Sequence, residues 1–451
     1  MSALLHRRSA RPQGEAQPLL DSADLHRILA WRAGHPVSAG AFLAQVGALK
    51  AQLPPGQFAV NLCTDRYRFL VAFCAAACAG QTNLLPSSRA PQAVAEVVRS
   101  HPNSYVLCDQ PLEDGPRPFV VPEPGDAGFA VDVPVLSAEQ SVAIGFTSGS
   151  SGQPKANIKR WGSFCASTAL NSRLLCGGSA APNIVATVPA QHMYGLEMSV
   201  LLPLRGRAAI HAGLPFFPAD VAHALGEVPA PRILVTTPLH LRALLQAGPL
   251  LPEIAAIVSA TAPLERELAA AAEERCATRV VELFGSTETC VIAHRDTARE
   301  NAWQPYSGVA LHPQPDGTLV TAPHFAAPTV LHDIIEMLPD GRFILRGRNS
   351  DLLEIAGKRA SLGDLTRRLL AVPGVVDGVM FPLDADANGV RRLGALVVAP
   401  TLSETDVLDA LRLAVDPVFL PRALRRIAAL PRTATGKLPR EALLAALRGQ
   451  S

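Results

Sequence analysis

Short apolar runs, often rich in β-branched residues, alternate with longer Ala- and Leu-rich stretches between residue 21 and about residue 345. The runs that we predict as strands are residues 142–146, 184–188, 233–236, 257–259 and 280–284. Each is followed within two residues by Gly, Pro, Ser or Thr, so polar loops gather at the strand ends. The alternation predicts an α/β fold, a class that places its ligands at the carboxyl ends of its strands.

A change of pattern near residue 347 predicts a second, smaller unit. Asp340-Gly341 has the composition of a hairpin turn between two apolar runs, and the chain becomes polar soon afterwards. One helix is expected after Ser361, with Asp364 at the capping-box position, and Ser403 is expected to cap another. The predicted organisation is a disordered N-terminus at 1–20, a large domain of β-sheets flanked by helices at 21–346, and a smaller, mobile α+β domain at 347–451.

Composition narrows the class of protein. Of the 451 residues, 48% are hydrophobic and 18% are charged, which suits a folded chain of about three units of roughly 150 residues. Lys+Arg (41) nearly balance Asp+Glu (39), so bulk nucleic-acid binding is not expected. The apolar run at 69–79 has eleven residues. Because a membrane-spanning helix needs roughly 20, we expect a buried helix there and no membrane span.

The N-terminus and the cysteines indicate a cytoplasmic protein. The opening residues contain no apolar stretch long enough for a secretory signal. The eight cysteines form no Cys-x-x-Cys pair, so neither a zinc site nor a disulfide framework is expected. Charge is uneven along the chain, since 347–451 holds 15 basic and 11 acidic residues whereas 1–346 holds 26 and 28. A basic small domain suits an acidic partner.

The strongest candidate for chemistry is Thr147-Ser-Gly-Ser-Ser-Gly-Gln-Pro-Lys155, directly after a predicted strand. Its glycines allow close backbone approach, its hydroxyls and amides suit phosphate oxygens, and its lysine adds a cation. A P-loop phosphotransferase is disfavoured, because Lys155 is followed by Ala156 in place of a hydroxyl residue. A flexible surface loop is the alternative interpretation, and the preceding strand and the Pro-Lys ending argue against it.

Three weaker motifs follow this loop in the sequence. Residues 282–288 offer an aromatic face, a Gly turn, a hydroxyl and a carboxylate, a set suited to base stacking, phosphate contact and Mg²⁺ binding. Asp333 and Arg348 flank the predicted hairpin and carry groups that hydrogen-bond a ribose. Residues 431–437 set a lysine on a glycine turn. Taken singly, each motif is also explained as a solvated surface segment.

Together the four motifs resemble the adenylate-forming superfamily, which includes acyl- and aryl-CoA synthetases, nonribosomal peptide adenylation domains and luciferases. The segments that carry the resemblance, in the family's order and rough spacing, are 147–155, 284–288, Gly347-Arg348 with Asp351 and 357–359, and 431–437. Residues 188–197 and 282–289 look like the compact stand-alone acid ligases of aryl polyene pigment pathways, which load an aryl or acyl acid onto a carrier protein.

The resemblance implies an ATP-dependent carboxylic acid ligase that forms AMP. A carboxylate attacks the α-phosphorus of ATP, pyrophosphate leaves, and a phosphopantetheine thiol then takes the acyl group from the adenylate. ATP, Mg²⁺ and the thiol of coenzyme A or of an acidic acyl carrier protein are the implied cofactors and acceptor. Two alternatives stay open: a non-catalytic nucleotide-binding relative, against which Lys437 and Glu288 argue, and a ligase with another acceptor.

The resemblance also implies roles for matching positions. The implied catalytic residues are Lys437, Thr287, Glu288 and His192, with Lys437 between the attacking carboxylate and the α-phosphate and Glu288 on the metal. The implied nucleotide-binding residues are Thr147, Ser148, Gly149, Ser150, Ser151, Gly152, Lys155, Thr261, Ala262, Glu282, Phe284, Gly285, Ser286, Asp333 and Arg348. The implied acid pocket is lined by His192, Tyr194, Gly195, Ser259 and Cys290.

Some positions depart from the family pattern or allow two interpretations. Leu331-His332-Asp333 keeps only the Asp of the usual Thr-Gly-Asp, and Ser350 stands at the hinge position. His192 either gates the acid pocket or is a core histidine. Cys290, where relatives often have Gly, either shortens that pocket or packs in the core. A basic cluster either docks a carrier protein or is a solvated face; its members are Arg391, Arg392, Arg422, Arg425 and Arg426.

Overall fold

The computed structural model describes residues 15–86, 89–111, 117–148, 154–178, 180–314, 317–348, 352–355, 358–384, 392–433 and 436–449. The chain divides into two compact units. Unit 1 comprises Met1–Glu300, Tyr306–Gly308 and Ala322–Ala327, and unit 2 comprises Asn301–Pro305, Val309–Thr321 and Pro328–Ser451. Within the described residues, no helix combines the length and the apolarity that a membrane span requires.

The first sheet of unit 1 has the strand order β10-β9-β5-β4-β6-β7. Its strands are β4 (Phe58–Asn61), β5 (Thr82–Leu85), β6 (Ser104–Cys108), β7 (Pro118–Val120), β9 (Ser141–Ser148) and β10 (Pro154–Arg160). The helices in this part of the chain are α1 (Ala39–Lys50), α2 (Arg66–Cys78) and α3 (Pro91–Ser100). The buried helix predicted at 69–79 is confirmed as α2, which begins after Asp65, whose side chain accepts from the Arg68 N–H at 2.7 Å.

The second sheet of unit 1 has the order β16-β15-β14-β13-β11-β12-β2-β3, and its six middle strands are parallel. The strands are β2 (Ile28–Arg32), β3 (His35–Ser38), β11 (Asn183–Ala186), β12 (Ala209–His211), β13 (Arg232–Thr236), β14 (Ala256–Ser259), β15 (Arg279–Ser286) and β16 (Cys290–Arg295). The accompanying helices are α4 (Trp161–Leu175), α5 (Met193–Leu196), the π-helix η1 (Glu197–Leu201), α6 (Leu202–Arg205), α7 (Pro218–Gly226), α8 (Pro238–Ala247) and α9 (Arg266–Cys276).

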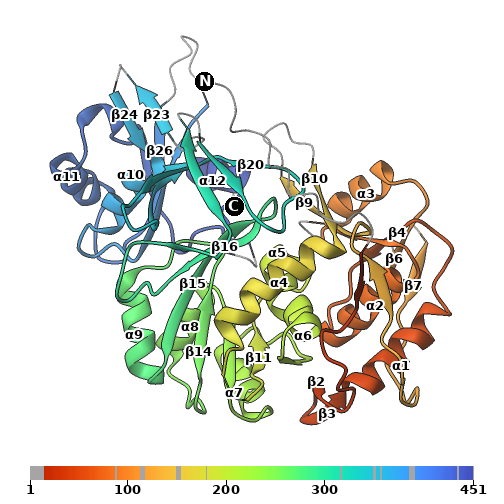
Figure 1. Ribbon diagram of the computed structural model, residues 1–451. Helices are drawn as coiled ribbons and strands as arrows, with labels where there is room; N and C mark the ends of the chain where they lie inside the picture. The colour runs from red at the N-terminus through yellow and green to blue at the C-terminus, as the bar shows by residue number, and fades with distance from the viewer. Residues whose placement is uncertain are drawn as a thin grey trace, which may run out of the picture. The chain divides into compact units, whose positions relative to one another are not determined.

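The core of this sheet explains why the predicted strands are continuous apolar runs. Val185, Leu234, Ile257 and Val280 come from four neighbouring strands and are buried in one cluster with apolar side chains of α7, α8 and α9. Figure 1 shows α8 and α9 beside β14 and β15. Parallel strands that helices cover lack the alternation of polar and apolar residues found in an exposed sheet. All five predicted strands are present, so these strands and the predicted α/β fold are confirmed.

The prediction of a disordered N-terminus to residue 20 is wrong for residues 15–20. β1 (Ala16–Pro18) pairs antiparallel with β8 (Val135–Ser137), and Leu19 and Leu20 are buried. The Ala- and Pro-rich composition suggested a free end, whereas pairing with a distant strand supplies its backbone hydrogen bonds. Residues 1–14 lie outside the described residues.

Unit 2 consists of small sheets and helices. Its strands are β17 (Gln304–Pro305), β18 (Ala310–Gln314), β19 (Gly317–Thr321), β20 (Thr329–Leu331), β21 (Asp333–Met337), β22 (Phe343–Arg348), β23 (Leu352–Ile355), β24 (Lys358–Ser361), β25 (Asp377–Pro382), β26 (Leu393–Val398) and β27 (Ala423–Arg426). Its helices are α10 (Leu362–Leu370), α11 (Glu404–Ala414), the short 3₁₀ turn η3 (Pro417–Phe419) and α12 (Arg440–Arg448). Leu369, Val397 and Leu411 belong to a core shared by α10, β26 and α11.

Two predicted features of unit 2 are confirmed. The hairpin of β21 and β22 turns at Asp340-Gly341, where Gly341 has a φ of +84°. Ser403 caps α11 in a reciprocal box, because its hydroxyl accepts from the Asp406 N–H and the Asp406 carboxylate accepts from the Ser403 N–H. The helix expected after Ser361 is α10, while the side chains of Ser361 and Asp364 lie outside what is described.

Candidate active site

Most predicted site residues of unit 1 lie at the carboxyl ends of its parallel strands. Ser259, the last residue of β14, stands opposite Thr236 of β13 and Glu282 of β15. His192 follows β11, and Thr287 follows β15. Because parallel strands end at the same edge of a sheet, segments that are distant in the sequence come together there.

Close backbone packing shapes the turn between β15 and β16. A Cβ on Gly285 would lie 2.1 Å from the carbonyl oxygen of Cys290, so only glycine fits. Cys290 itself has a φ of +58°, in the left-handed region that side chains rarely adopt. The Ser286 N–H donates to Thr289 Oγ1 at 3.0 Å, and the Thr289 N–H donates to Ser286 Oγ at 3.3 Å. These two bonds brace the residues between them.

The side chains of this turn form an accessible set and a buried set. The half-exposed residues are Phe284, Ser286, Thr287 and Glu288. Cys290 is buried, with its thiol 3.9 Å from Met193 Sδ. Burial raises the pKa of this thiol to about 12, so the thiol is neutral near pH 7. These contacts favour the interpretation of Cys290 as a packed interior residue.

Glu282, a predicted nucleotide-binding residue, has its carboxylate surrounded by protein donors. It is 3% exposed, and Oε2 forms an ion pair with Arg295 Nε at 2.7 Å. The hydroxyl of Thr297 donates to the same oxygen at 2.6 Å, and the Leu264 N–H donates to Oε1 at 2.9 Å. These contacts give Glu282 a structural task that the sequence did not reveal; a direct nucleotide contact stays a prediction.

The predicted phosphate loop connects β9 to β10. These strands form an antiparallel hairpin in which Thr147 and Lys155 stand opposite each other. Thr147 is half-exposed, Lys155 is exposed, and Ser148 is the last residue of β9. The strand predicted before the loop is therefore confirmed, and a second strand follows it. The remaining predicted members lie outside the described residues: Gly149, Ser150, Ser151 and Gly152.

Two residues of the predicted acid pocket are fixed by backbone contacts. Tyr194 is buried, and its hydroxyl lies 3.2 Å from the carbonyl oxygen of Thr236, at the end of β13. Burial raises the pKa of this phenol, which is therefore a neutral donor. A Cβ on Gly195 would lie 2.0 Å from the carbonyl oxygen of Pro189, so this position requires glycine.

The segment leading to His192 is held by two arginines that sequence reasoning missed. His192 is the half-buried residue that precedes α5. Arg66 is fully buried and donates to the carbonyl oxygen of Val188 at 2.8 Å; burial lowers the pKa of its guanidinium to about 10. Arg89 Nε donates to Gln191 Oε1 at 2.7 Å. Arg66 follows the helix-capping Asp65, so the sequence offered only a helix-start signal.

The end of β14 and the segment after it have two features typical of ligand contact. Ser259 is fully buried, and its hydroxyl has no hydrogen-bond partner among the residues that the structure describes. Buried hydroxyls are nearly always paired, so this one suits a bound group. Thr261 has a φ of +81°, and such strain in a β-branched residue is concentrated at functional sites. Ala262 beside it is half-exposed.

Unit 2 carries the other predicted residues in two places. Asp333 and Arg348 are register partners across the hairpin of β21 and β22, and Asp333 is buried. Lys437 is exposed at the end of a turn in which its N–H donates to Thr433 Oγ1 at 3.1 Å. The predicted glycine turn is confirmed, because Gly436 has a φ of +79°.

An ion pair anchors the turn that carries Lys437. Arg432 forms bonds of 2.8 and 2.9 Å from Nη2 to the two carboxylate oxygens of Asp377 on β25. Arg432 Nη1 also donates to the carbonyl oxygen of Gly436 at 3.2 Å. Arg432 thus links Gly436, the residue before Lys437, to β25 of the same unit.

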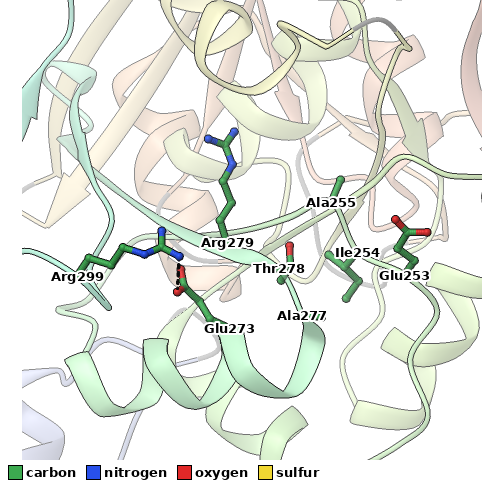
Figure 2. A pocket seen from close by; sticks show the side chains of 8 residues that line it. All are labelled: Glu253, Ile254, Ala255, Glu273, Ala277, Thr278, Arg279 and Arg299. Carbon is green, nitrogen blue, oxygen red and sulfur yellow. Dashed lines mark hydrogen bonds and ion pairs between the residues drawn. The ribbon is translucent and has the colours of Figure 1, made fainter.

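A hollow of about 620 Å³ lies at the other end of the strands of unit 1. Figure 2 shows its lining, which includes Arg279, the first residue of β15, and the ion pair of Glu273 with Arg299. Ser259 and Ser286 end the same strands at their carboxyl termini. This charged hollow is therefore separate from the candidate active site.

Comparison with known proteins gives the family and the fold. Residues 36–316 match the family of AMP-binding enzymes. The chain is 28% identical over 329 residues to the 4-coumarate–CoA ligase of Rhodobacter capsulatus, covering 68% of this chain and 77% of the relative. It is 32% identical over 112 residues to the 3-hydroxybenzoate–CoA/4-hydroxybenzoate–CoA ligase of Thauera aromatica, covering 24% of this chain and 21% of that protein.

A solved structure shares the fold across almost the whole chain. It is the o-succinylbenzoate coenzyme A synthetase of Bacillus subtilis in complex with ATP and magnesium, with a TM-score of 0.80 and 18% identity over 95% of this chain and 99% of that one. The family match spans more than half of the sequence. The chain therefore belongs to the AMP-binding enzymes of the adenylate-forming superfamily.

Proposed function

We propose that this chain, an ATP-dependent and AMP-forming acid–thiol ligase, activates an aryl or acyl acid and passes it to a phosphopantetheine thiol. The observation that carries the proposal is the edge of the second sheet, where His192, Ser259 and the 286–290 turn follow neighbouring parallel strands. This arrangement supports an acid pocket and a nucleotide site side by side, as the reaction requires.

Within unit 1, the proposed nucleotide site uses the half-exposed side chains of this edge and the loop between β9 and β10. The 147–155 loop holds the β- and γ-phosphates, Thr287 contacts the α-phosphate and Phe284 packs on adenine. Asp333 and Arg348 hold the ribose hydroxyls. Their pairing across β21 and β22 supports a shared target, because the two residues lie at the same level of the hairpin.

Magnesium fits this site as a partner of ATP. Among the described residues, no group of three His, Cys, Asp or Glu side chains gathers to hold a metal. Mg²⁺ commonly keeps several waters and binds through one or two carboxylates together with substrate phosphates. The half-exposed Glu288 supplies such a carboxylate. When bound, the ion neutralises charge on the phosphates.

In the first half-reaction the acid carboxylate attacks the α-phosphorus, the bond to the β-phosphate oxygen breaks and pyrophosphate leaves. Lys437 donates to the attacking carboxylate and the α-phosphate, where negative charge accumulates. Thr287 donates to the same phosphate. The anchored turn next to Lys437 limits the conformations of this cation before it reaches the substrate.

In the second half-reaction the acceptor thiol attacks the acyl carbonyl, a thioester forms and AMP leaves. His192, held near the sheet edge, guides the carboxylate or the thiol. The boundary that we propose between the two domains, at 346/347, allows the C-terminal domain to rotate between the half-reactions; Ser350 at the hinge lies outside the described residues. A cytoplasmic location would supply ATP and reduced thiols.

The proteins similar to this chain indicate the class of acid. The similarity to proteins named 4-coumarate–CoA ligase and 3-hydroxybenzoate–CoA/4-hydroxybenzoate–CoA ligase supports an aromatic acid. The resemblance of 188–197 and 282–289 to aryl polyene ligases supports an aryl or acyl acid and loading of a carrier protein.

Carrier docking is proposed on the basic cluster of the C-terminal domain. Arg425 Nη1 donates to the carbonyl oxygen of Leu447, and Arg426 Nη1 donates to that of Leu402. These bonds hold the half-buried Arg425 and the exposed Arg426 in place. Arg392 is exposed, and Arg391 lies outside the described residues. An acidic carrier would meet this cluster through salt-sensitive contacts.

A pyrophosphate-release screen tests the proposal. The acids are benzoate, 4-hydroxybenzoate, 4-coumarate, acetate, hexanoate and octanoate, each with coenzyme A or with a phosphopantetheinylated carrier protein. Release that depends on the acid and on ATP, with a thioester as product, is expected. No acid-dependent release with any acid would favour the non-catalytic alternative. Charge reversal at Arg392 should slow loading of the carrier and leave the coenzyme A reaction unchanged.

A further inference from the structure

The turn after β15 is held by two buried charged side chains from elsewhere in unit 1. Lys159 Nζ on β10 donates to the carbonyl oxygen of Glu288 at 2.9 Å. The carboxylate of Glu197, the first residue of η1, accepts from the Val291 N–H at 3.1 and 3.2 Å. One charge therefore fixes the backbone on each side of Thr289 and Cys290.

The surroundings of Lys159 and Glu197 leave them little freedom. Lys159 is 7% exposed and Glu197 is 1% exposed. The Ser167 hydroxyl donates to Glu197 Oε1 at 2.7 Å, and Asn171 Nδ2 does so at 3.3 Å. Burial raises the pKa of Glu197, while these donors and the positive charge of Lys159 act in the opposite direction. Buried charges are costly unless they are paired and bonded, so this arrangement fixes both side chains.

The β9–β10 hairpin meets the turn at a second point. Gly145 on β9 pairs with Asn157 on β10, and a Cβ at Gly145 would lie 2.9 Å from Thr287 Cγ2. Lys159 is two residues beyond Asn157, so its side chain lies on the face of the hairpin that Gly145 presents to the turn. Lys155, two residues before Asn157, lies on this face as well. One strand thus connects the phosphate loop to the residues after β15.

We propose that Lys159 and Glu197 are positioning residues for adenylation. They hold the 287–291 backbone so that Thr287 and Glu288 keep a fixed position relative to Lys155, near the other end of β10. The inference rests on the proposed function, because it assigns a task within the same site. Neither residue contacts substrate, and both act through the backbone of the turn.

The test separates positioning from stability with a pair of substitutions. Lys159→Met removes the bond to Glu288 and leaves the carboxylate of Glu197 without its neighbouring cation. The double variant Lys159→Met/Glu197→Gln removes both charges, and its amide oxygen still accepts from Val291. The charge of Lys159 acts on Glu197 by lowering its pKa, and removing two neighbouring buried charges together is tolerated better than removing one. Arg160→Met is the matched control, since Arg160 is the next residue and bonds to Glu139 on the surface.

The measurements are acid-dependent ATP–pyrophosphate exchange, with the fastest acid of the panel above, and thermal unfolding. We expect Lys159→Met to lower kcat by about 10–100-fold, by analogy with loss of an orienting contact, with the KM for the acid changed less than about threefold. The double variant should regain most of the lost Tm and remain slow. The Mg²⁺ concentration for half-maximal exchange should rise in both variants and stay unchanged in Arg160→Met.

Two outcomes would overturn the inference. In one, the double variant regains both Tm and kcat, which makes the pair purely structural. In the other, Lys159→Met matches Arg160→Met in kcat while its Tm falls. If Lys159→Met does not fold, the double variant is compared with Arg160→Met and with the wild type instead. Failure of the proposed function is distinct, because the wild-type chain would then show no acid-dependent exchange, whether or not ATP and Mg²⁺ raise its Tm.

Discussion

The contacts of Glu282 make a sharp prediction about stability. Glu282→Ala removes an ion-pair partner of Arg295, whose side chain is 15% exposed. It also removes the acceptor of the Thr297 hydroxyl and of the Leu264 N–H. Breaking a buried ion pair by removing one partner costs about 3–5 kcal/mol. The three contacts share one carboxylate, so their separate costs do not add.

The expected change in melting temperature follows from the size of the unit. Unit 1 has about 300 residues, and its unfolding entropy is about 2.1 cal/mol/K per residue. A loss of 1 kcal/mol in the free energy of unfolding therefore lowers Tm by roughly 1.6 °C. Glu282→Ala should therefore lower Tm by about 5–8 °C. Glu282→Gln keeps an acceptor for the Leu264 N–H but loses the charge and the second acceptor oxygen, so its loss of Tm should be intermediate.

Thermal unfolding with and without ATP and Mg²⁺ is the assay. Glu274→Ala is the control, because Glu274 is exposed on the neighbouring helix α9, and surface substitutions change stability by about 0.5 kcal/mol or less. The KM for ATP of Glu282→Gln should stay within about twofold of the wild type, because the side chain is enclosed by protein groups. If the Glu282 variants keep a Tm within about 1 °C of the wild type and show a large increase in the KM for ATP, the structural role of Glu282 is wrong and direct nucleotide contact is favoured.

Three further predictions concern the site itself. Lys437→Ala should lower adenylation by about 10²–10³-fold, roughly 3–4 kcal/mol, and leave Tm unchanged because the side chain is exposed; near-normal acid-dependent pyrophosphate exchange would contradict its assignment. Gly285→Ala should displace the 286–290 turn and slow exchange more than about tenfold, since the new Cβ would lie 2.1 Å from the Cys290 carbonyl oxygen; a variant with wild-type kinetics would show that the turn tolerates a side chain. Iodoacetamide at about pH 8 should leave Cys290 unmodified in peptide mass spectra, because burial raises the pKa of its thiol to about 12 and the reactive thiolate is scarce below that pH; rapid labelling of the folded protein would argue against the buried position.

The sequence predicted those parts of the fold that depend on local pattern. The runs at 257–259 and 280–284 are strands because they are buried on both faces, and Asp340-Gly341 turns because Gly tolerates a positive φ. Pairing between distant segments was not accessible in this way. β1 pairs with a strand more than 100 residues away, and its Ala- and Pro-rich composition gives no sign of it.

In the candidate site too, residues in local motifs were predicted and residues that act through distant contacts were not. Motif residues such as Thr287 and Lys437 were found because their loops have a distinctive composition. Residues that hold those loops were missed, because their partners are backbone groups that no motif encodes: Arg66 bonds to a carbonyl after β11, and Lys159 bonds to one after β15. Alternation along β10 from Lys155 would have placed Lys159 on the same face, but β10 itself was not predicted.

Isotope exchange without any thiol reports directly on acyl-adenylate formation, the step on which the proposed function depends. The wild-type chain is incubated with ATP, Mg²⁺, labelled pyrophosphate and each acid of the panel, and the acyl adenylate is sought by mass spectrometry. Label should enter ATP only when an acid is present, together with the appearance of an acyl-AMP of the matching mass. Formation of ADP, or no exchange and no acyl-AMP with any acid, would contradict the proposed function.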